Sequence, residues 1–263
     1  MPSQTTTSKP SLELDAALRA ARAAESVISH YYRSGVQVQL KADRTPVTVA
    51  DTEAEGVIRE LLLDAFPDHG VYGEEAGVQG GERPSLWLVD PIDGTKSFVR
   101  GYPFFSTQIA LLRDGKLVLG VSCAPAFGQM AWAERGHGAY LDGARLAVSQ
   151  VAELEDCTVS FGNMKTLAGD RRWGAVGQLV RRANRARGYG DFYHYHLLAS
   201  GSIDLVIESD VNILDVAALS VIVEEAGGRF TDLAGRPLGL ATRSVLASNG
   251  PLHALALDLL GEP

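Results

Sequence analysis

The sequence is poor in cysteine, lacks long hydrophobic runs and has no excess of basic residues. Two cysteines, Cys123 and Cys157, occur in 263 residues, and neither belongs to a C-x-x-C pair, which excludes a disulfide framework. No segment reaches the roughly 20 apolar residues that cross a membrane. The formal net charge of −8 excludes the basic face of a nucleic-acid scaffold. We therefore expect a cytoplasmic protein with buried free thiols that binds neither nucleic acid nor a membrane.

The length and composition are typical of a globular enzyme. Hydrophobic residues make up 46% and charged residues 21% of the chain, and this length is ample for a large core. Residues 1–10 are polar and rich in serine and threonine, which predicts a disordered tail without a secretion signal. We predict an N-terminal α+β half over residues 11–149 and a C-terminal α/β half over residues 150–263.

Hydrophobic periodicity predicts most of the secondary structure. Apolar residues at helical spacing predict a helix over 12–34 and a second from about residue 50 to the residue before Pro67. Antiparallel hairpins are predicted at 106–122, with an Asp-Gly turn, and at 130–140. The other predicted elements are strands over 71–73, 86–89, 158–161, 204–207, 228–232 and 244–247, and helices over 171–184, 192–200, 215–226 and from 252.

The segment Trp-Leu-Val-Asp-Pro-Ile-Asp-Gly-Thr-Lys-Ser-Phe is the most informative part of the chain. Residues 86–89 predict a buried strand that ends at Asp90, because Pro91 has no N–H for a further ladder bond. Asp93 follows three residues after Asp90, across the predicted turn, so both carboxylates can face one point. Carboxylate oxygens are ligands for hard divalent cations such as magnesium.

The same turn offers a place for a phosphate. Gly94 and Thr95 follow the two aspartates, and a strand-to-helix turn there would present backbone N–H groups to an anion. Asp-Pro and Asp-Gly pairs are also common in ordinary turns. This segment alone is therefore compatible with either a simple turn or a metal and phosphate site.

Three further carboxylates stand at predicted element boundaries. Asp51 and Asp215 open helices and Glu74 follows a short strand. Each alone could be a helix cap or a solvated loop residue. Together with Asp90 and Asp93 they would make five converging carboxylates, which repel one another unless cations neutralise them. The set therefore predicts two or three divalent ions and two-metal hydrolysis of a phosphate ester.

Four motifs in order resemble the inositol monophosphatase family of metal-dependent, lithium-sensitive phosphatases, from about Lys41 to the C-terminus. They are Val-Thr-Val-Ala-Asp at 47–51, Gly-Glu-Glu at 73–75, Asp-Pro-Ile-Asp-Gly-Thr at 90–95, and Asp-Val-Ala-Ala at 215–218 followed by Glu-Ala-Gly-Gly at 225–228. The resemblance implies a layered αβαβα sandwich of the inositol monophosphatase and fructose-1,6-bisphosphatase type, usually a homodimer, with two to three magnesium ions per active site.

The resemblance also implies a role for each matching residue. The implied metal ligands are Glu74, Asp90, the backbone oxygen of Ile92, Asp93 and Asp215. The implied catalytic residues are Glu74, Thr95 and Asp51, of which Thr95 and Asp51 orient the attacking water. Gly94, Thr95 and Lys41 match the phosphate-binding residues. One departure is Leu214, where the family usually has tryptophan, and this change is expected to loosen packing behind Asp215 without removing a ligand.

Within the family, two segments resemble the histidinol-phosphate phosphatase branch. They are Lys96-Ser97-Phe98 and Gly188-Tyr189-Gly190-Asp191. Histidinol phosphate carries an ammonium and an imidazole, and a desolvated cation needs a carboxylate partner. Asp191 and Glu208 are the candidates for this contact, although each could be an ordinary capping or solvent-facing acid. Arg187 either reaches the site or pairs with an acid across a dimer.

The predicted reaction is in-line attack of a metal-activated water on phosphorus, without a covalent intermediate. The six histidines are scattered, and His194 and His196 should face different sides of their helix, so none is assigned as a nucleophile. Histidinol phosphate is the expected substrate. Inositol 1-phosphate and a 3'(2'),5'-bisphosphate nucleotide are alternatives, and so are a non-catalytic phosphate or metal sensor and a structural module.

Overall fold

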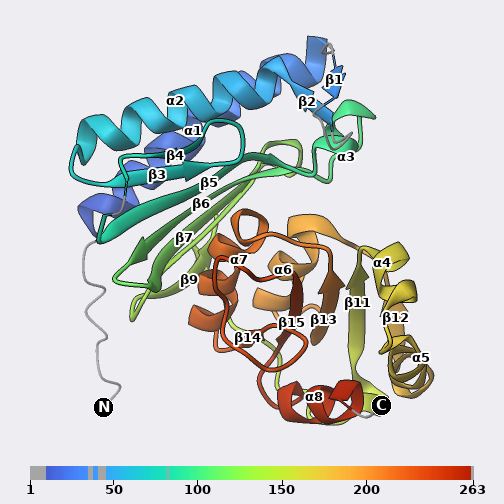
Figure 1. The fold of residues 1–263 in the computed structure, drawn as a ribbon. Coiled ribbons are helices and arrows are strands. Elements are labelled where there is room, and N and C mark those ends of the chain that lie inside the picture. The colour runs from blue at the N-terminus through green and yellow to red at the C-terminus, as the bar shows by residue number, and fades with distance from the viewer. Residues whose placement is uncertain (1–9, 35–37, 41–45, 82, 262–263) are drawn as a thin grey trace.

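Two β-sheets alternate with three layers of helices in the computed structural model (Figure 1). The structure describes residues 10–34, 38–40, 46–81 and 83–261. Nearly all of the predicted tail over 1–10 lies outside these ranges, and so does Lys41. The helices are α1 (Leu12–Ser34), α2 (Val49–Ala65), α3 (Thr95–Val99), α4 (Met164–Gly169), α5 (Trp173–Arg182), α6 (Asp191–Ala199), α7 (Ile213–Glu225) and α8 (His253–Gly261), with short 3-10 turns η1 (Pro125–Phe127) and η2 (Leu154–Asp156).

The helices are divided among the three layers by their apolar faces. Helices α1 and α2 cover the outer face of the first sheet. Helices α6 and α7 lie between the sheets, and α5 and α8 cover the outer face of the second. This arrangement is the layered αβαβα sandwich predicted from the sequence, and the fold prediction is confirmed.

The first sheet contains both predicted hairpins. Its strands are β3 (Gly70–Gly73), β4 (Gly77–Gln79), β5 (Ser85–Asp93), β6 (Ser106–Arg113), β7 (Lys116–Ala124), β8 (Gln129–Glu134), β9 (Gly138–Leu141) and β10 (Ala144–Arg145). They lie in the order β10-β9-β8-β7-β6-β5-β3-β4. Only the β3/β5 pair is parallel. Asp114 and Gly115 both have positive φ between β6 and β7, as the tight Asp-Gly turn requires.

The second sheet is smaller and mixed. Its strands are β11 (Thr158–Gly162), β12 (Arg185–Arg187), β13 (Leu205–Ser209), β14 (Arg229–Thr231) and β15 (Ser244–Ser248). They lie in the order β12-β11-β13-β15-β14, and β11 is parallel to both of its neighbours. A separate two-stranded ladder joins β1 (Val38–Leu40) to β2 (Pro46–Thr48). The division of the chain into halves at residue 150 stays a prediction.

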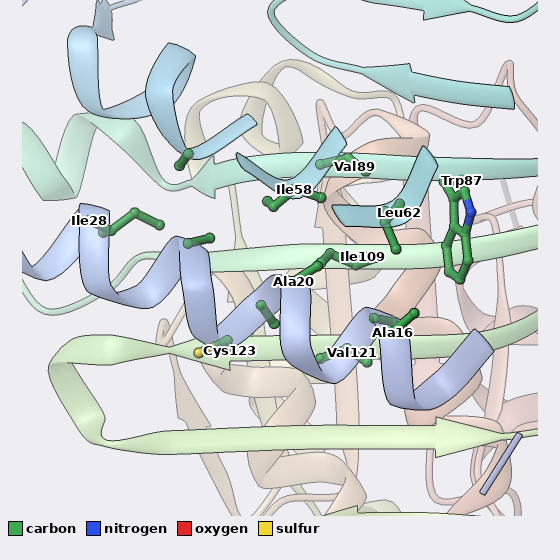
Figure 2. Packing of buried hydrophobic residues seen from close by; sticks show 14 of the residues in the cluster. Ala16, Ala20, Ile28, Ile58, Leu62, Trp87, Val89, Ile109, Val121 and Cys123 are labelled. Atoms are coloured by element: carbon green, nitrogen blue, oxygen red, sulfur yellow. The ribbon is translucent and has the colours of Figure 1, made fainter. Parts of the chain in front are cut away.

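Small residues let α1 lie close to the first sheet. Ala16, Ala20 and Ile28 of α1 are fully or almost fully buried and face β5, β6 and β7, beside Leu62 of α2 and Trp87 of β5 (Figure 2). Burying a leucine, isoleucine or comparable side chain is worth roughly 1.5–3 kcal/mol. The predicted boundaries of both helices are confirmed to within two residues.

Helix α7 packs even more closely on the other face of the same sheet. A Cβ atom at Gly120 of β7 would lie 2.3 Å from the backbone oxygen of Ala218. Only glycine permits this approach, because a methyl group there would overlap the helix backbone. The close packing holds α7, which carries Asp215 in its first turn, against the face of the first sheet over its central strands.

One prediction about an element is wrong, and some elements were not predicted. Strand β5 does not end at Asp90 but continues to Asp93. Pro91 lies in a bulge between these two residues, where no backbone N–H is needed for pairing with the next strand. The predicted helix over 171–184 covers α5, but α4 and the strand β12 around it were not predicted. Strand β12 is a three-residue edge strand of sequence Arg-Ala-Arg, which carries no hydrophobic alternation.

No helix in the described part of the chain is both long and apolar enough to cross a membrane.

Candidate active site

Three carboxylates from two distant segments converge at one point. Asp90 and Asp93 come from the end of β5, and Asp215 comes from the first turn of α7. Each offers an oxygen atom, and these atoms all lie within 4.8 Å of one another. Oxygen atoms at this spacing, all from carboxylates, can hold a hard divalent cation.

Local hydrogen bonds shape the turn that presents the two aspartates. The Ile92 N–H donates to Asp90 Oδ1 at 3.0 Å, and the Thr95 hydroxyl donates to the Ile92 carbonyl at 3.0 Å. The Thr107 hydroxyl of β6 donates to the Pro91 carbonyl at 2.8 Å. These contacts fix the bulged end of β5, so Asp90 and Asp93 are held in place before any ion binds.

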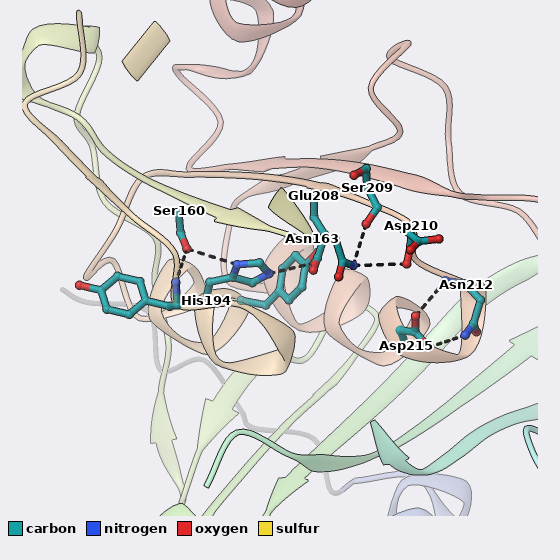
Figure 3. Close-up of polar contacts among 10 residues, drawn as sticks. Ser160, Asn163, His194, Glu208, Ser209, Asp210, Asn212 and Asp215 are labelled. Atoms are coloured by element: carbon teal, nitrogen blue, oxygen red, sulfur yellow. Dashed lines mark hydrogen bonds and ion pairs between the residues drawn. The ribbon is translucent and has the colours of Figure 1, made fainter. Parts of the chain in front are cut away.

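Asp51 and Asp215 are both the third residue of a helix and both complete a capping box. Asp215 accepts from the backbone N–H of Asn212 at 2.9 Å and from its side-chain amide at 2.5 Å (Figure 3). Asp51 accepts from the N–H of Thr48 at 2.8 Å and from its hydroxyl at 2.6 Å. Each of these aspartates can therefore be a helix cap and a carboxylate of the acidic cluster at the same time. The cap sets the direction of each carboxylate, and the remaining lone pairs face the site.

Glu74 lies beside Asp90 because their strands are parallel neighbours. Gly73 pairs with Val89, the Glu74 N–H donates to the Val89 carbonyl at 3.2 Å, and the next residue in β5 is Asp90. Burial is the main cause that raises the pKa of both Asp90 and Asp51, and the nearby Glu74 carboxylate adds to it in each case. The structure therefore brings the five predicted carboxylates into one neighbourhood.

Burial and mutual repulsion make these carboxylates costly to ionise. Burial is the main cause that raises the pKa of Asp90 well above its ordinary range, and Glu74 and Asp93 add to it. Asp93 is raised well above its ordinary range by burial first and then by Asp215. Burial also raises the pKa of Asp215 to about 7, against the hydrogen bonds from Asn212. A bound cation would favour the ionised forms, so this donor set fits a divalent metal ion.

Thr95 lies where the site meets the predicted phosphate-binding turn. Its hydroxyl is 3.3 Å from Asp51 Oδ1. Gly94 before it has φ of +87°, and a Cβ there would lie 2.5 Å from the Phe104 carbonyl. Glycine is therefore required at 94 on two grounds, backbone conformation and space. The predicted phosphate contacts of Gly94 and Thr95 stay a prediction, and Lys41 lies outside the described residues.

The two predicted substrate acids share a cavity with the metal-site aspartates. A cavity of about 40 Å³ is lined by Asp93, Asn163, Asp191, Tyr195, Glu208, Val211, Asp215, Val216 and Leu219. Its walls come from the first sheet, the second sheet and both helices between them. Arg187 is not among its lining residues. Arg187 is exposed, and its Nη1 donates to the Ala186 carbonyl at 2.7 Å.

Sequence reasoning missed three residues at this site. Tyr195 and His194 of α6 both contact Glu208. Tyr195 Oη donates to its Oε2 at 2.6 Å, and His194 Nε2 lies 3.1 Å from the same atom (Figure 3). Asn163 donates its amide to the Ser209 carbonyl at 2.7 Å. The available signal was Glu208 itself, because an acid within the apolar strand Leu-Val-Ile-Glu-Ser needs buried partners.

The two histidines of α6, Leu214 and the two cysteines are all buried in the structure. His194 and His196 do face different sides of α6, because His196 Nε2 contacts the Ser122 hydroxyl of β7 at 2.9 Å rather than Glu208. Leu214 is buried in an apolar cluster with Leu88 and Ala110. Cys123 and Cys157 are buried free thiols, as predicted, and burial raises the pKa of each to about 12.

Comparison with known proteins agrees with this geometry. The model of the inositol monophosphatase family matches residues 11–262. The histidinol-phosphatase of Streptomyces coelicolor is 42% identical over 236 residues, and that of Mycobacterium tuberculosis is 43% identical over 233 residues, with 86% of this chain and 88% of each relative covered. The crystal structure of the extragenic suppressor protein suhB from Bartonella henselae has a TM-score of 0.87 at 31% identity, covering 96% of this chain and 99% of that one. The chain therefore belongs to the inositol monophosphatase family.

Proposed function

We propose that this protein is a magnesium-dependent phosphatase that hydrolyses histidinol phosphate to histidinol, a step of histidine biosynthesis. One observation carries the proposal. Asp93 and Asp215 of the carboxylate cluster line the same cavity as Asp191 and Glu208. The cavity itself, at about 40 Å³, is far smaller than a phosphate ester, so it marks the point where the two pairs of acids meet, with the phosphate proposed at the carboxylate cluster and the cationic group at Asp191 and Glu208. The two curated histidinol-phosphatases at 42% and 43% identity support the same substrate.

The proposed metal ligands are Glu74, Asp90, the Ile92 carbonyl, Asp93 and Asp215, which would hold two to three magnesium ions. Bound magnesium supplies Lewis-acid stabilisation of the charge that develops on the phosphoryl oxygens and activates water. All the side-chain ligands are carboxylates, which magnesium prefers. The chain's own contribution is to fix these oxygens before the substrate arrives, through the bulge of β5 and the caps of α2 and α7.

We assign Thr95 and Asp51 to the attacking water. The Thr95 hydroxyl has one proton, which has the Ile92 carbonyl at 3.0 Å as one acceptor and can turn to Asp51 Oδ1 at 3.3 Å. Its oxygen lone pairs can then accept a hydrogen bond from water and orient it toward phosphorus. The backbone N–H groups of Gly94 and Thr95, with Lys41, are proposed to bind the phosphate.

Asp191 and Glu208 are proposed to bind the ammonium or imidazolium of the substrate. Burial and, after it, the nearby Glu208 raise the pKa of Asp191 to about 6, while His194 and Lys96 oppose the shift. Two buried acids that repel each other are stabilised when a cation comes between them. A neutral polyol such as inositol would not give this stabilisation. Inositol 1-phosphate remains the second candidate, since the family model is that of inositol monophosphatases.

Phosphate release from a substrate panel tests the proposal. We expect hydrolysis of histidinol phosphate with magnesium and none with chelator. The kcat/KM for inositol 1-phosphate and for 3'(2'),5'-adenosine bisphosphate should be at least ~10-fold lower than that for histidinol phosphate. This ratio corresponds to the loss of one hydrogen bond to a charged group. Glu208→Gln should remove most of this preference. Equal or greater kcat/KM for inositol 1-phosphate with the unaltered protein would refute the proposed substrate.

We also propose a cytoplasmic homodimer. The buried free thiols fit a reducing compartment. Met164, Trp173 and Val180 are large exposed apolar side chains on the neighbouring helices α4 and α5, and β12, which carries Arg187, is an edge strand. Exposed apolar side chains and an unpaired sheet edge are features of protein interfaces. Light scattering should give twice the chain mass, and Trp173→Glu should give monomers. A monomer from the unaltered protein would refute the dimer.

A further inference from the structure

Glu208 is held from one side by a buried set of hydrogen-bond donors. It lies in β13, is 5% exposed, and sits next to Gly162 of the parallel strand β11. A Cβ atom on Gly162 would be 2.0 Å from Glu208 Oε1. The Glu208 side chain therefore occupies the space that any larger residue at 162 would fill, which fixes its direction along the end of the sheet.

One carboxylate oxygen of Glu208 receives both donors. Tyr195 Oη donates to Oε2 at 2.6 Å, and His194 Nε2 lies 3.1 Å from the same atom. Both residues belong to α6 and are at most 1% exposed. Oε1 accepts no hydrogen bond from any other described residue in the structure. The donors therefore occupy one oxygen and leave the other for a group in the cavity.

The tautomer of His194 follows from its second neighbour. The Ser160 hydroxyl accepts from the Tyr189 N–H at 3.2 Å and lies 3.3 Å from His194 Nδ1 (Figure 3). Ser160 is fully buried, and His194 Nδ1 is the acceptor that the described residues offer to its proton. We therefore assign the His194 proton to Nε2, which then donates to Glu208. The hydrogen bonds thus run in one direction, from the Tyr189 N–H to Ser160, from Ser160 to His194, and from His194 to the Glu208 carboxylate.

We propose that Tyr195 and His194 are positioning residues that make Glu208 a selector for substrates with a cationic leaving portion. Two donors hold the Glu208 side chain at Oε2, and Glu208 lines the cavity shared with Asp93 and Asp191. A cation from the substrate supplies the missing partner through a charge-assisted hydrogen bond, whereas a neutral hydroxyl group supplies only a weaker one. This inference rests on the proposed function, because it concerns the choice of substrate at the same site.

Tyr195→Phe tests the inference with one atom removed. We expect the KM for histidinol phosphate to rise ~10-fold, which is the lower end of what a hydrogen bond to a charged group is worth. The kcat for histidinol phosphate, and both constants for inositol 1-phosphate, should stay within ~2-fold. In a Glu208→Gln background the same substitution should change the KM for histidinol phosphate less than ~2-fold, because the two residues act as one unit.

Tyr193→Phe is the matched control. Tyr193 lies on the same helix and stacks on Phe127 at a centroid distance of 4.7 Å. It makes no contact with Glu208 among the described residues, so its substitution should leave the preference unchanged. Binding of histidinol, the product, measured by calorimetry should weaken ~10-fold with Tyr195→Phe and remain unaltered with Tyr193→Phe.

The outcomes separate this inference from the proposed function. Unaltered protein that prefers inositol 1-phosphate over histidinol phosphate overturns both. Unaltered protein that prefers histidinol phosphate, together with a Tyr195→Phe variant that keeps this preference and binds histidinol equally well, overturns only the positioning role. Equal losses on both substrates would also overturn it, because they indicate a general structural defect. A selective rise in the KM for histidinol phosphate supports it.

Discussion

Divalent metal should stabilise this protein strongly at alkaline pH and weakly at acidic pH. The reason is that the carboxyl groups of the cluster have raised pKa values. The pKa of Asp215 is raised to about 7 from an ordinary 3.8. A shift of about three units corresponds to about 4 kcal/mol at about 1.4 kcal/mol per unit. The pKa of Asp215 is higher in the folded than in the unfolded state. The metal-free protein therefore keeps this contribution to its free energy of unfolding below about pH 4 and loses it as the pH rises through about 7.

Metal binding should recover that loss. A cation beside the carboxylate favours its ionised form, and about 4 kcal/mol corresponds to a rise in Tm of about 8 °C for a chain of this length. At about pH 5 the carboxyl is already protonated, so magnesium must displace a proton and its affinity falls about tenfold per pH unit for each proton displaced. Burial raises the pKa of Asp90 and Asp93 too, which strengthens the dependence.

Thermal melts with and without saturating magnesium at about pH 8 and about pH 5 measure the effect, and calorimetry in two buffers counts the protons released near pH 6. The Tm shift should shrink from about 8 °C to below about 3 °C as the pH falls. Asp215→Asn is the control, and it should melt higher than the unaltered protein without metal at alkaline pH and respond little to magnesium. An equal Tm shift at both pH values, or binding without proton release, would refute the reasoning.

Three substitutions test other parts of the structure. Asp93→Asn should keep the fold by circular dichroism and lower kcat at least ~10²-fold, and near-normal rates with saturating magnesium would contradict its role. Glu55→Gln weakens the hydrogen bonds at 2.7 and 2.9 Å that hold the loop after β3, and should raise the magnesium dissociation constant ~10-fold, whereas the exposed Glu60→Gln should not. If both bind magnesium alike, Glu55 has no such role. Gly120→Ala should lower the free energy of unfolding by ~1–3 kcal/mol, because its methyl group would overlap Ala218, and an unchanged Tm would contradict that packing.

Neighbouring residues carried most of what the sequence predicted correctly. The helix over 12–34 follows from apolar residues repeating every three or four positions, and the hairpin at 106–122 follows from its Asp-Gly turn. The capping roles of Asp51 and Asp215 also follow from residues within one helical turn. Such features depend on contacts over a few residues, and hydrogen bonds and side-chain periodicity act at that range.

The path of β5 shows where local reasoning failed. Pro91 lacks an N–H, so the strand was predicted to end at Asp90. The neighbouring strand β6 instead accommodates a bulge, with the Thr107 hydroxyl bonded to the Pro91 carbonyl, and pairing resumes at Asp93. The strand end depended on which partner lay beside it, and a partner from another part of the chain cannot be inferred from the residues of the strand alone.

The sequence by itself determined which residue types could bind a cation and a phosphate, and in which local turns they stand. Only the tertiary structure decided that Asp93 and Asp215 share a cavity with Asp191 and Glu208, and that Tyr195 and His194 direct Glu208. The physical reason is that these groups belong to different sheets and helices. Their distances are set by how close the layers pack, through contacts such as that of Gly120 with α7, rather than by the spacing of residues along the chain.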